Sequence, residues 1–368
     1  MPDIAPLTMP KLGLSMTEGQ VAAWHKADGE AITAGEEIAD IETPKITTAL
    51  ESPAAGTLRR KLVGPGEIVP VGALIGVLAD PVTPEAEVEA FIEEWRARFA
   101  AEKEAEPEAA VPEPERVETP YGPIQVLEAG PREAPPVVLI HGFGSDYQSF
   151  LLLQPLLASR FFTLAIDLPG HGGSTKNLPG PDPASLAKAV SAAMTARGIE
   201  AAHLVGHSLG GAVALALAEQ EPARALALTL ISPAGLGPEI NAEFIAGFIA
   251  ARRPRALATV LALLFADEKT PVGHEVVEAV LRAKRLDGAE AALSAIAAAN
   301  FPAGRQAYSL RHVLDDPARP ANVVWGRHDR IIPASQAGRL PAHVKVAIYE
   351  DAGHVAHMEK PEQVARLI

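Results

Sequence analysis

The sequence predicts two domains of different fold class within its 368 residues. Residues 1–80 consist of short apolar stretches punctuated by glycine, such as GQVAAW and ALIGVLA, which is typical of short strands separated by turns. In residues 119–368, apolar strand candidates alternate with helical segments, which is typical of a parallel sheet covered on both faces. We therefore expect a small all-β domain followed by a larger α/β domain.

Composition limits what the chain can do. Apolar residues make up 48% of it, enough to build cores, and a formal net charge of -14 disfavours binding to nucleic acid or to an anionic membrane. There is no cysteine, so disulfides, cysteine-ligated zinc and cysteine catalysis are excluded, and we expect no metal site. No signal peptide or run of about 20 apolar residues is visible, and we expect a cytoplasmic protein.

Residues 81–118 separate the two domains and are rich in Pro, Ala and Glu. From residue 85 to residue 118 there are 12 Glu against four Arg or Lys, and the second half is predicted to be an extended, charge-stiffened linker. Residues 85–100 carry an apolar stripe at helical spacing, formed by Val88, Phe91, Ile92, Trp95 and Phe99. We expect this amphipathic helix to pack on the α/β domain, and the alternative is a docking helix for a partner protein.

The α/β domain is expected to contain a helical insertion. Six apolar stretches are candidates for fully buried strands, at residues 137–140, 161–166, 203–206, 226–231, 322–325 and 344–349. The segment from about residue 235 to residue 319 interrupts this rhythm, because it is long, helical and apolar and lies between two strand candidates. That pattern is typical of a helical cap inserted over a site.

The turn around Lys45 is the most informative part of the small domain. Two strand-like runs flank the TPKI segment, and Pro44 suits the first central position of a type I turn because its φ is already fixed there. Lys45 is then expected at an exposed hairpin tip, where an enzyme could acylate its long side chain. The alternative is an ordinary surface lysine.

The small domain resembles the lipoyl domains of the 2-oxo acid dehydrogenase family. The resemblance rests on MPKLGLSMTEG at 9–19, WHK and DGE within 24–30, the ETPK turn that ends at Lys45, and PGEIVPVG at 65–72. Related biotinyl domains carry methionine on both sides of the lysine, whereas proline and isoleucine stand here, which favours lipoate. The resemblance implies a lipoyl group on Lys45 that accepts an acyl group from a thiamine-dependent enzyme and is reoxidised by a flavin-dependent dehydrogenase.

The segment GHSLG at 206–210 fits the G-x-S-x-G pattern between a strand candidate and a helical stretch. Such a sharp turn requires small residues at both glycines, lifts Ser208 out of the sheet, and places it over a helix N-terminus that favours developing negative charge. The segment resembles the nucleophile turn of the α/β-hydrolase family. The resemblance implies an oxyanion hole formed by the N–H groups of Leu209 and of Phe143, which lies in HGFG after an earlier strand candidate.

The order of residues along the chain assigns the acid and the base. Asp329 and His354 follow the last two strand candidates, which gives the Ser, Asp, His order of α/β-hydrolases. His354 is expected to take the proton of Ser208, and Asp329 to fix the tautomer of His354. Asp351 is the rival acid, and Asp329 is preferred because it lies at the carboxyl end of a strand. A noncatalytic relative that keeps the fold is the alternative.

Other histidines receive a structural interpretation. DLPGHG at 167–172 is a further hallmark of the hydrolase family and is interpreted as structural. His171, within it, comes too early in the chain order to be the base. His207, His328 and His357 are interpreted as polar loop residues.

The combination of the two domains is informative in itself. The H-x-x-x-D-G motif of the usual lipoyl-domain acyltransferases is absent, since the only similar segment, HKADG at 25–29, is one residue short. A lipoyl domain followed by an α/β-hydrolase domain resembles the acyltransferase component of bacterial acetoin dehydrogenase complexes. The resemblance implies that an acetyl group moves from lipoyl-Lys45 through Ser208 towards coenzyme A.

That resemblance also implies partners. They are a thiamine-diphosphate-dependent acetoin dehydrogenase component and dihydrolipoamide dehydrogenase, in an oligomeric assembly. Two alternatives stay open. In one, the second domain is an esterase, thioesterase or C–C hydrolase that the lipoyl domain recruits to the complex. In the other, the protein is mainly a scaffold.

Overall fold

The computed structural model describes residues 4–10, 18–42, 47–105, 113–267, 270, 272–338 and 340–368. They belong to two compact units, divided between Ala110 and Val111 and described separately below. The predicted lipoyl-attachment residue, Lys45, lies outside the described residues. Within the described ranges, no helix has the length and apolar character needed to cross a membrane.

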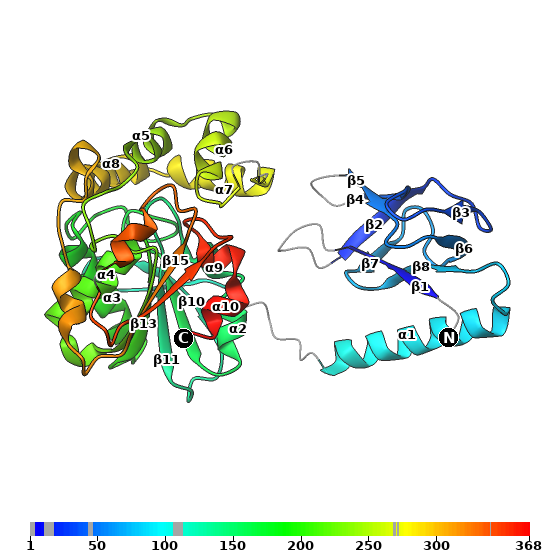
Figure 1. The fold of residues 1–368 in the computed structure, drawn as a ribbon, viewed down its shortest axis with the longest axis horizontal. Coiled ribbons are helices and arrows are strands. Elements are labelled where there is room, and N and C mark those ends of the chain that lie inside the picture. The colour runs from blue at the N-terminus through cyan, green and yellow to red at the C-terminus, as the bar shows by residue number, and fades with distance from the viewer. Residues whose placement is uncertain are drawn as a thin grey trace. The chain divides into compact units, whose positions relative to one another are not determined.

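The first unit begins with two four-stranded sheets, ordered β1-β8-β6-β3 and β5-β4-β2-β7, in which all pairs are antiparallel (Figure 1). The strands are β1 (Ala5–Thr8), β2 (Glu18–Trp24), β3 (Ala31–Ile32), β4 (Glu37–Glu42), β5 (Thr47–Glu51), β6 (Gly56–Lys61), β7 (Ile68–Pro70) and β8 (Leu74–Ala79). Apolar side chains of both sheets form one core that includes Val21, Ile38, Ile41, Leu58 and Ile75. The predicted all-β domain is confirmed.

Helix α1 (Glu85–Ala105) packs against this small unit, so the predicted packing on the α/β domain is wrong. The apolar stripe of the helix faces β8, where Val88 and Ile92 are buried against Leu74 and Val77. The strand is buried along its whole length because the sheet core covers one face and α1 covers the other. The continuous apolar run LIGVLA, without alternation, was the sequence signal for such a cover.

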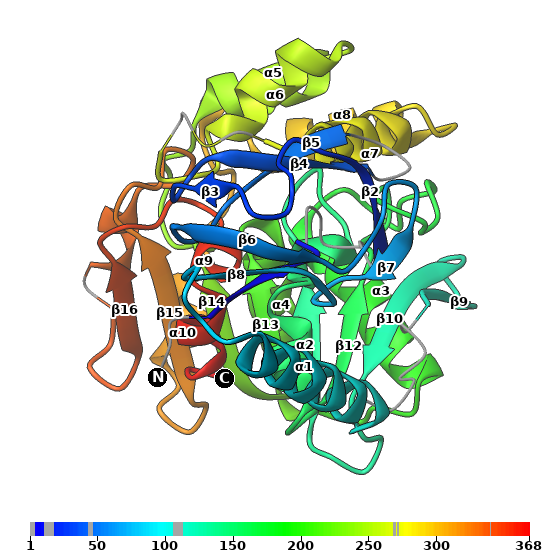
Figure 2. The ribbon, with the colours of Figure 1, turned by 90° about the vertical axis from the view of Figure 1, so that its right-hand side faces the viewer.

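The second unit contains an eight-stranded sheet with the order β16-β15-β14-β13-β11-β12-β10-β9 (Figure 2). Its strands are β9 (Glu115–Val117), β10 (Ile124–Ala129), β11 (Pro136–Ile140), β12 (Phe162–Ile166), β13 (Ala202–His207), β14 (Ala225–Ile231), β15 (Ala321–Gly326) and β16 (Lys345–Tyr349). The six strands from β11 to β16 are parallel to one another, whereas β9 and β10 pair antiparallel at one edge. The predicted parallel sheet is confirmed.

Helices cover both faces of this sheet. They are α2 (Gln154–Ala158), α3 (Pro183–Ala196), α4 (Leu209–Gln220), α9 (Ala356–Glu359) and α10 (Pro361–Ala365), with short 3-10 turns η1 (Tyr147–Phe150), η2 (Pro222–Arg224), η3 (Pro302–Gly304), η4 (Arg311–Asp315) and η5 (Ala334–Ala337). Helices α3 and α4 bury their apolar sides on one face, and α2, α9 and α10 bury theirs on the other.

The two edges of the sheet differ from the sequence-based expectation. Strand β9 lies within the segment assigned to the linker, so the sheet of the second unit begins before residue 119. Strand β10 escaped prediction because its polar residues, Gln125 and Glu128, interrupt the apolar run. Strand β16 was expected to be fully buried, but it forms the other edge and exposes Lys345 and Val346.

The predicted helical insertion lies between β14 and β15. It contains α5 (Ala242–Ala250), α6 (Pro254–Ala262), α7 (His274–Lys284) and α8 (Ala289–Asn300). In Figure 1 these four helices form a layer of their own above the sheet of the second unit. We refer to α5–α8 as the cap.

Candidate active site

Ser208 stands at a sharp turn between β13 and α4. Its backbone has φ 53° and ψ -117°, a left-handed conformation that is strained for any residue with a side chain. A Cβ atom on Gly206 would lie 2.4 Å from the carbonyl oxygen of Gly210, and one on Gly210 would lie 2.1 Å from that of Ile140. The predicted need for small residues at both glycines is therefore confirmed. The side chain of Ser208 stays 6% exposed at the head of the helix.

Asp329 and His354 lie in the loops that follow β15 and β16, and their side chains contact each other. The Nδ1 atom of His354 lies 2.9 Å from Oδ2 of Asp329, and the side chains are 2% and 0% exposed, respectively. The other carboxylate oxygen of Asp329 accepts hydrogen bonds from the backbone N–H groups of Ile331 and Ile332, at 2.8 and 2.9 Å. These bonds fix the carboxylate, so Nδ1 of His354 is engaged and Nε2 is left for another partner.

Asp351, the rival acid, is turned away from His354. Its carboxylate is 74% exposed and pairs with Lys360, which lowers the pKa of Asp351 through a side-chain hydrogen bond. The structure therefore brings Asp329, and not Asp351, to the histidine.

The loop after β11 packs against the turn that carries Ser208. A Cβ atom on Gly142 would lie 3.0 Å from Cβ of Ser208, so the two backbones approach as closely as the glycine allows. Phe143 and Leu209 are buried, at 8% and 0% exposure. Within the described residues, neither of their backbone N–H groups makes a hydrogen bond. Two such donors beside a serine hydroxyl can stabilise an oxyanion.

Sequence reasoning missed that two further histidines surround the His354 base candidate. His207 and His357 were interpreted as polar loop residues, but they are 5% and 0% exposed. The His207 ring lies 4.8 Å from the His354 ring and 4.5 Å from the His357 ring, and its Nε2 lies 3.0 Å from the backbone oxygen of His354. Of the three histidines interpreted in this way, His328 alone is exposed, as expected.

Burial keeps these two histidines neutral. It lowers the pKa of His357 to about 3 and that of His207 well below the ordinary value, with nearby histidine charges as the next cause. Because the Nε2 atom of His207 faces a carbonyl oxygen, it must carry the proton and donate. His207 thereby connects the turn that carries Ser208 to the loop that carries His354.

The DLPGHG segment holds neighbouring loops together through hydrogen bonds to Asp167, in agreement with its structural interpretation. Asp167 accepts hydrogen bonds from the N–H groups of Tyr147 and Gly173, both at 2.7 Å, and from the side chain of Gln125 at 2.9 Å. Burial raises the pKa of Asp167 to about 7 and lowers that of His171 to about 4. The His171 ring packs edge-on against the Phe143 ring, 6.2 Å away, which makes it a support of the Phe143 loop.

The cap contacts the loops of both halves of the site. The ring of Phe248 in α5 lies 5.6 Å from that of Phe143, and a Cβ atom on Gly144 would collide with it at 2.3 Å. On the other side, the backbone N–H of His354 donates to the carbonyl oxygen of Leu264, which follows α6, at 2.8 Å. The cap therefore lies over the carboxyl ends of the strands, where Ser208 and His354 stand.

In the first unit, the strands that flank Lys45 are paired up to the segment that carries it. Strands β4 and β5 are antiparallel neighbours, and Glu42 lies opposite Thr47. The four residues 43–46, outside the described ranges, connect two paired strands. Among the described residues, no group of three or more His, Asp or Glu could hold a metal ion.

Comparisons with known proteins define the class of both units. Residues 135–361 match the α/β hydrolase fold family, and residues 5–78 match the family of biotin-requiring enzymes that includes lipoyl domains. A crystal structure of a membrane phospholipase A covers 76% of this chain and 93% of its own, with TM-score 0.60 and 26% identity. A meta-cleavage product hydrolase from Pseudomonas fluorescens covers 69% and 95%, with TM-score 0.61 and 23% identity. The chain is a lipoyl domain joined to a member of the α/β hydrolase family.

Two curated relatives match the chain from end to end. One, from Pseudomonas putida, is 43% identical over 99% of this chain and 97% of its own. The other, from Cupriavidus necator, is 40% identical over 100% of this chain and 97% of its own. Both are described as the dihydrolipoyllysine-residue acetyltransferase component of an acetoin cleaving system. The chain belongs to this family of acetyltransferase components.

Proposed function

We propose that this protein transfers an acetyl group from a lipoyl arm on Lys45 to coenzyme A, with Ser208 as the intermediate carrier. The observation that carries the proposal is the buried pair of Asp329 and His354, 2.9 Å apart, together with Ser208 in a strained turn whose neighbour His207 contacts the backbone oxygen of His354. A chain that also carries a lipoyl domain has an acyl donor for such a serine.

The first unit fits a lipoyl group on Lys45. The residue stands between two paired strands, and the relatives matched from end to end are named for a dihydrolipoyllysine residue. When attached, the group supplies an acyl thioester on a flexible tether. Tethering raises the local concentration of that thioester at the second unit to roughly millimolar, so weak docking is sufficient.

The residues of the second unit then act on the thioester. Ser208 Oγ attacks the carbonyl carbon while its proton passes to Nε2 of His354. The carbonyl oxygen becomes an oxyanion that accepts from the N–H groups of Phe143 and Leu209. As the C–S bond breaks, His354 returns the proton to the departing sulfur, and the acetyl group remains on Ser208 as an ester. Asp329 stabilises the transient imidazolium.

In the second half of the reaction, the acetyl group passes from Ser208 to coenzyme A, and the same residues act in the reverse order. His354 takes the proton of the coenzyme A thiol, whose sulfur attacks the ester carbonyl. The C–O bond breaks, the proton returns to Ser208 Oγ, and acetyl-coenzyme A leaves. Water attacking the same ester would release acetate instead. The cap contacts both the Phe143 loop and the His354 loop, so it can exclude water from the ester.

The proposal places the protein between two partner enzymes. A thiamine-diphosphate-dependent acetoin dehydrogenase component would load the arm on Lys45, and dihydrolipoamide dehydrogenase would reoxidise it. The full-length relatives are described as components of an acetoin cleaving system, which supports a multienzyme setting. A scaffold role based on an unpartnered α1 stripe loses its support, because that stripe is buried against β8.

The test compares Ser208→Ala with the wild type in the lipoylated full-length protein. Acetyl-dihydrolipoamide serves as donor, and acetyl-coenzyme A and acetate are both quantified. We expect the variant to lose transfer by about three orders of magnitude or more, and intact mass to detect an acetyl adduct on wild-type Ser208 only. Transfer by Ser208→Ala at the wild-type rate would refute the serine route. Acetate as the dominant product of the wild type would establish a hydrolase instead.

A further inference from the structure

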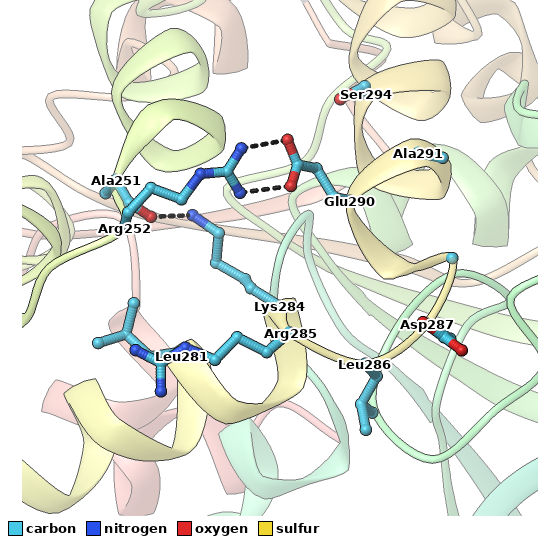
Figure 3. A pocket seen from close by; sticks show the side chains of 11 residues that line it. Ala251, Arg252, Leu281, Lys284, Arg285, Leu286, Asp287, Glu290, Ala291 and Ser294 are labelled. Atoms are coloured by element: carbon cyan, nitrogen blue, oxygen red, sulfur yellow. Dashed lines mark hydrogen bonds and ion pairs between the residues drawn. The ribbon is translucent and has the colours of Figure 1, made fainter.

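A pocket lies within the cap. Its volume is about 550 Å³, and it is formed where the ends of α5 and α7 meet the start of α8 (Figure 3). The lining residues are Ala251, Arg252, Leu281, Lys284, Arg285, Leu286, Asp287, Gly288, Glu290, Ala291 and Ser294. None of them belongs to the triad or to the proposed oxyanion hole. The volume falls within the range of about 300–1,000 Å³ that small-molecule sites occupy.

Three cationic side chains line the pocket. Arg252 forms two hydrogen bonds with the carboxylate of Glu290. Lys284 is only 7% exposed and donates to backbone carbonyl oxygens at the end of α5. Arg285 is exposed and, within the described part of the chain, its guanidinium group forms no hydrogen bond or ion pair. Figure 3 shows these cations on one side of the pocket, with the Asp287 carboxylate pointing away from them.

The local charge favours an anion. The lining holds three cations against Asp287 and Glu290, an excess of one positive charge in a chain whose net charge is -14. Arg252 already neutralises Glu290, which leaves Arg285 available to a ligand. The pKa of Lys284 is lowered first by burial and then by the charge of Arg252, which outweighs the opposite effect of Glu290. An anion bound here would relieve this repulsion.

The pocket lies one aromatic side chain away from the proposed oxyanion hole. The Nζ atom of Lys284 stands 4.9 Å from the centroid of the Phe248 ring. That ring packs on Phe143, whose N–H is one of the proposed oxyanion donors, with 5.6 Å between the ring centroids. A ligand held in the pocket is therefore near enough to extend a long, narrow arm to Ser208.

We propose that this pocket binds the phosphorylated nucleotide end of coenzyme A. The inference rests on the proposed acetyl transfer, because the acceptor of that reaction carries phosphates at one end and its thiol at the end of a long uncharged arm. Arg285 would contact a phosphate, since guanidinium groups bind phosphate oxygens in a planar, bidentate way. Leu286, which is 49% exposed, provides apolar surface for the adenine ring.

The test reverses one charge in the full-length lipoylated protein. Arg285→Glu is the informative variant because Lys284 and Arg252 also hold the cap together. Transfer is measured with coenzyme A and with pantetheine, which has the same thiol arm without the nucleotide. We expect the ratio of KM for coenzyme A to KM for pantetheine to rise about tenfold or more, the size of one hydrogen bond to a charged group. Arg282→Glu, exposed on α7 but outside the lining, is the charge-matched control.

Binding is measured separately from chemistry. Adenosine 3′,5′-bisphosphate is titrated calorimetrically into full-length Ser208→Ala protein, with and without Arg285→Glu. A weaker Kd on charge reversal supports the pocket even if Ser208→Ala proves to transfer acetyl groups normally. Equal Kd values would overturn the assignment, as would a KM ratio that changes equally in Arg285→Glu and Arg282→Glu. Failure of the pocket and failure of the serine route are thus distinguishable.

Discussion

The two units position their reactive residues by different means. In the sequence, Lys45 lies between β4 and β5, which are paired with each other. Ser208, Asp329 and His354 stand after three different strands. Between Ser208 and Asp329 lie 120 residues, which include the whole cap. The proposed carrier residue is thus flanked by one local strand pair, whereas the proposed triad draws on three strands of one sheet. Damage to one unit should therefore leave the chemistry of the other intact.

The largest effect is expected from a variant that removes the lipoyl attachment on Lys45 but leaves the acyl-transfer residues of the second unit unchanged. Lys45→Arg keeps the charge but cannot carry a lipoyl group, so acetyl transfer driven by the acetoin dehydrogenase component should fall to background. Turnover of free acetyl-dihydrolipoamide should stay within about twofold of the wild type, because it needs only the second unit. Lys61→Arg, on β6 of the same unit, is the control. Loss of both activities in Lys45→Arg would show that the units are not independent.

The next effect concerns the acid of the proposed triad. Asp329→Asn should lower kcat by about 10³–10⁴-fold, because the amide no longer fixes the productive tautomer of His354. Asp351→Asn should remain within about twofold, since its carboxylate is exposed and pairs with Lys360. Both variants are assayed with acetyl-dihydrolipoamide and coenzyme A at saturation. A larger loss in Asp351→Asn than in Asp329→Asn would reverse the assignment of the acid.

The same contrast explains which features could be predicted from the sequence. The GHSLG motif, which is confined to one strand-turn segment, indicated its local geometry because neighbouring residues determine it. The chain order of Asp329 and His354 also sufficed to pair them, since parallel strands end at one edge of the sheet. The carrier domain and the six parallel strands were predictable for similar reasons.

The missed features depend on contacts between distant segments. His207 and His357 are 150 positions apart in the sequence. Their ring centroids lie 4.5 Å apart only because the fold brings the end of β13 next to α9. The stripe of α1 showed that the helix packs on an apolar surface but could not show on which one. Periodicity defines the face of a helix, whereas the choice between two domains depends on which sheet leaves an apolar face uncovered.

The position of α1 predicts a stability change confined to the first unit. Ile92 is 1% exposed against Leu74 and Val77, so Ile92→Ala should destabilise that unit by about 2–5 kcal/mol. Urea unfolding is followed in the full chain by hydrogen exchange, which reports each unit separately. Glu94→Ala, on the exposed side of the same helix, should cost less than about 0.5 kcal/mol. Destabilisation of the second unit by Ile92→Ala would show that α1 supports that unit instead.

The smallest effect is a pH dependence in the second unit. The pKa of His357 is lowered to about 3 in the folded state by burial, against an ordinary value of 6.5. Between about pH 3 and pH 6.5, His357 binds a proton in the unfolded chain but not in the folded protein. The free energy of unfolding therefore rises with pH in this range and decreases as the pH falls below about 6.5. For this residue alone, the difference in the free energy of unfolding between pH 7 and pH 5 is about 2 kcal/mol.

His357→Gln should remove that part of the pH dependence, whatever it does to stability at pH 7. Asp167 has the opposite effect, because its raised pKa favours the folded state at low pH. The pH dependence of unfolding is therefore compared between variant and wild type. His328→Gln, which changes an exposed histidine of the same unit, is the control and should follow the wild type. Denaturant unfolding at pH 5 and pH 7 measures the difference. If the three proteins lose equal stability between these pH values, His357 is not the buried neutral group that its surroundings require.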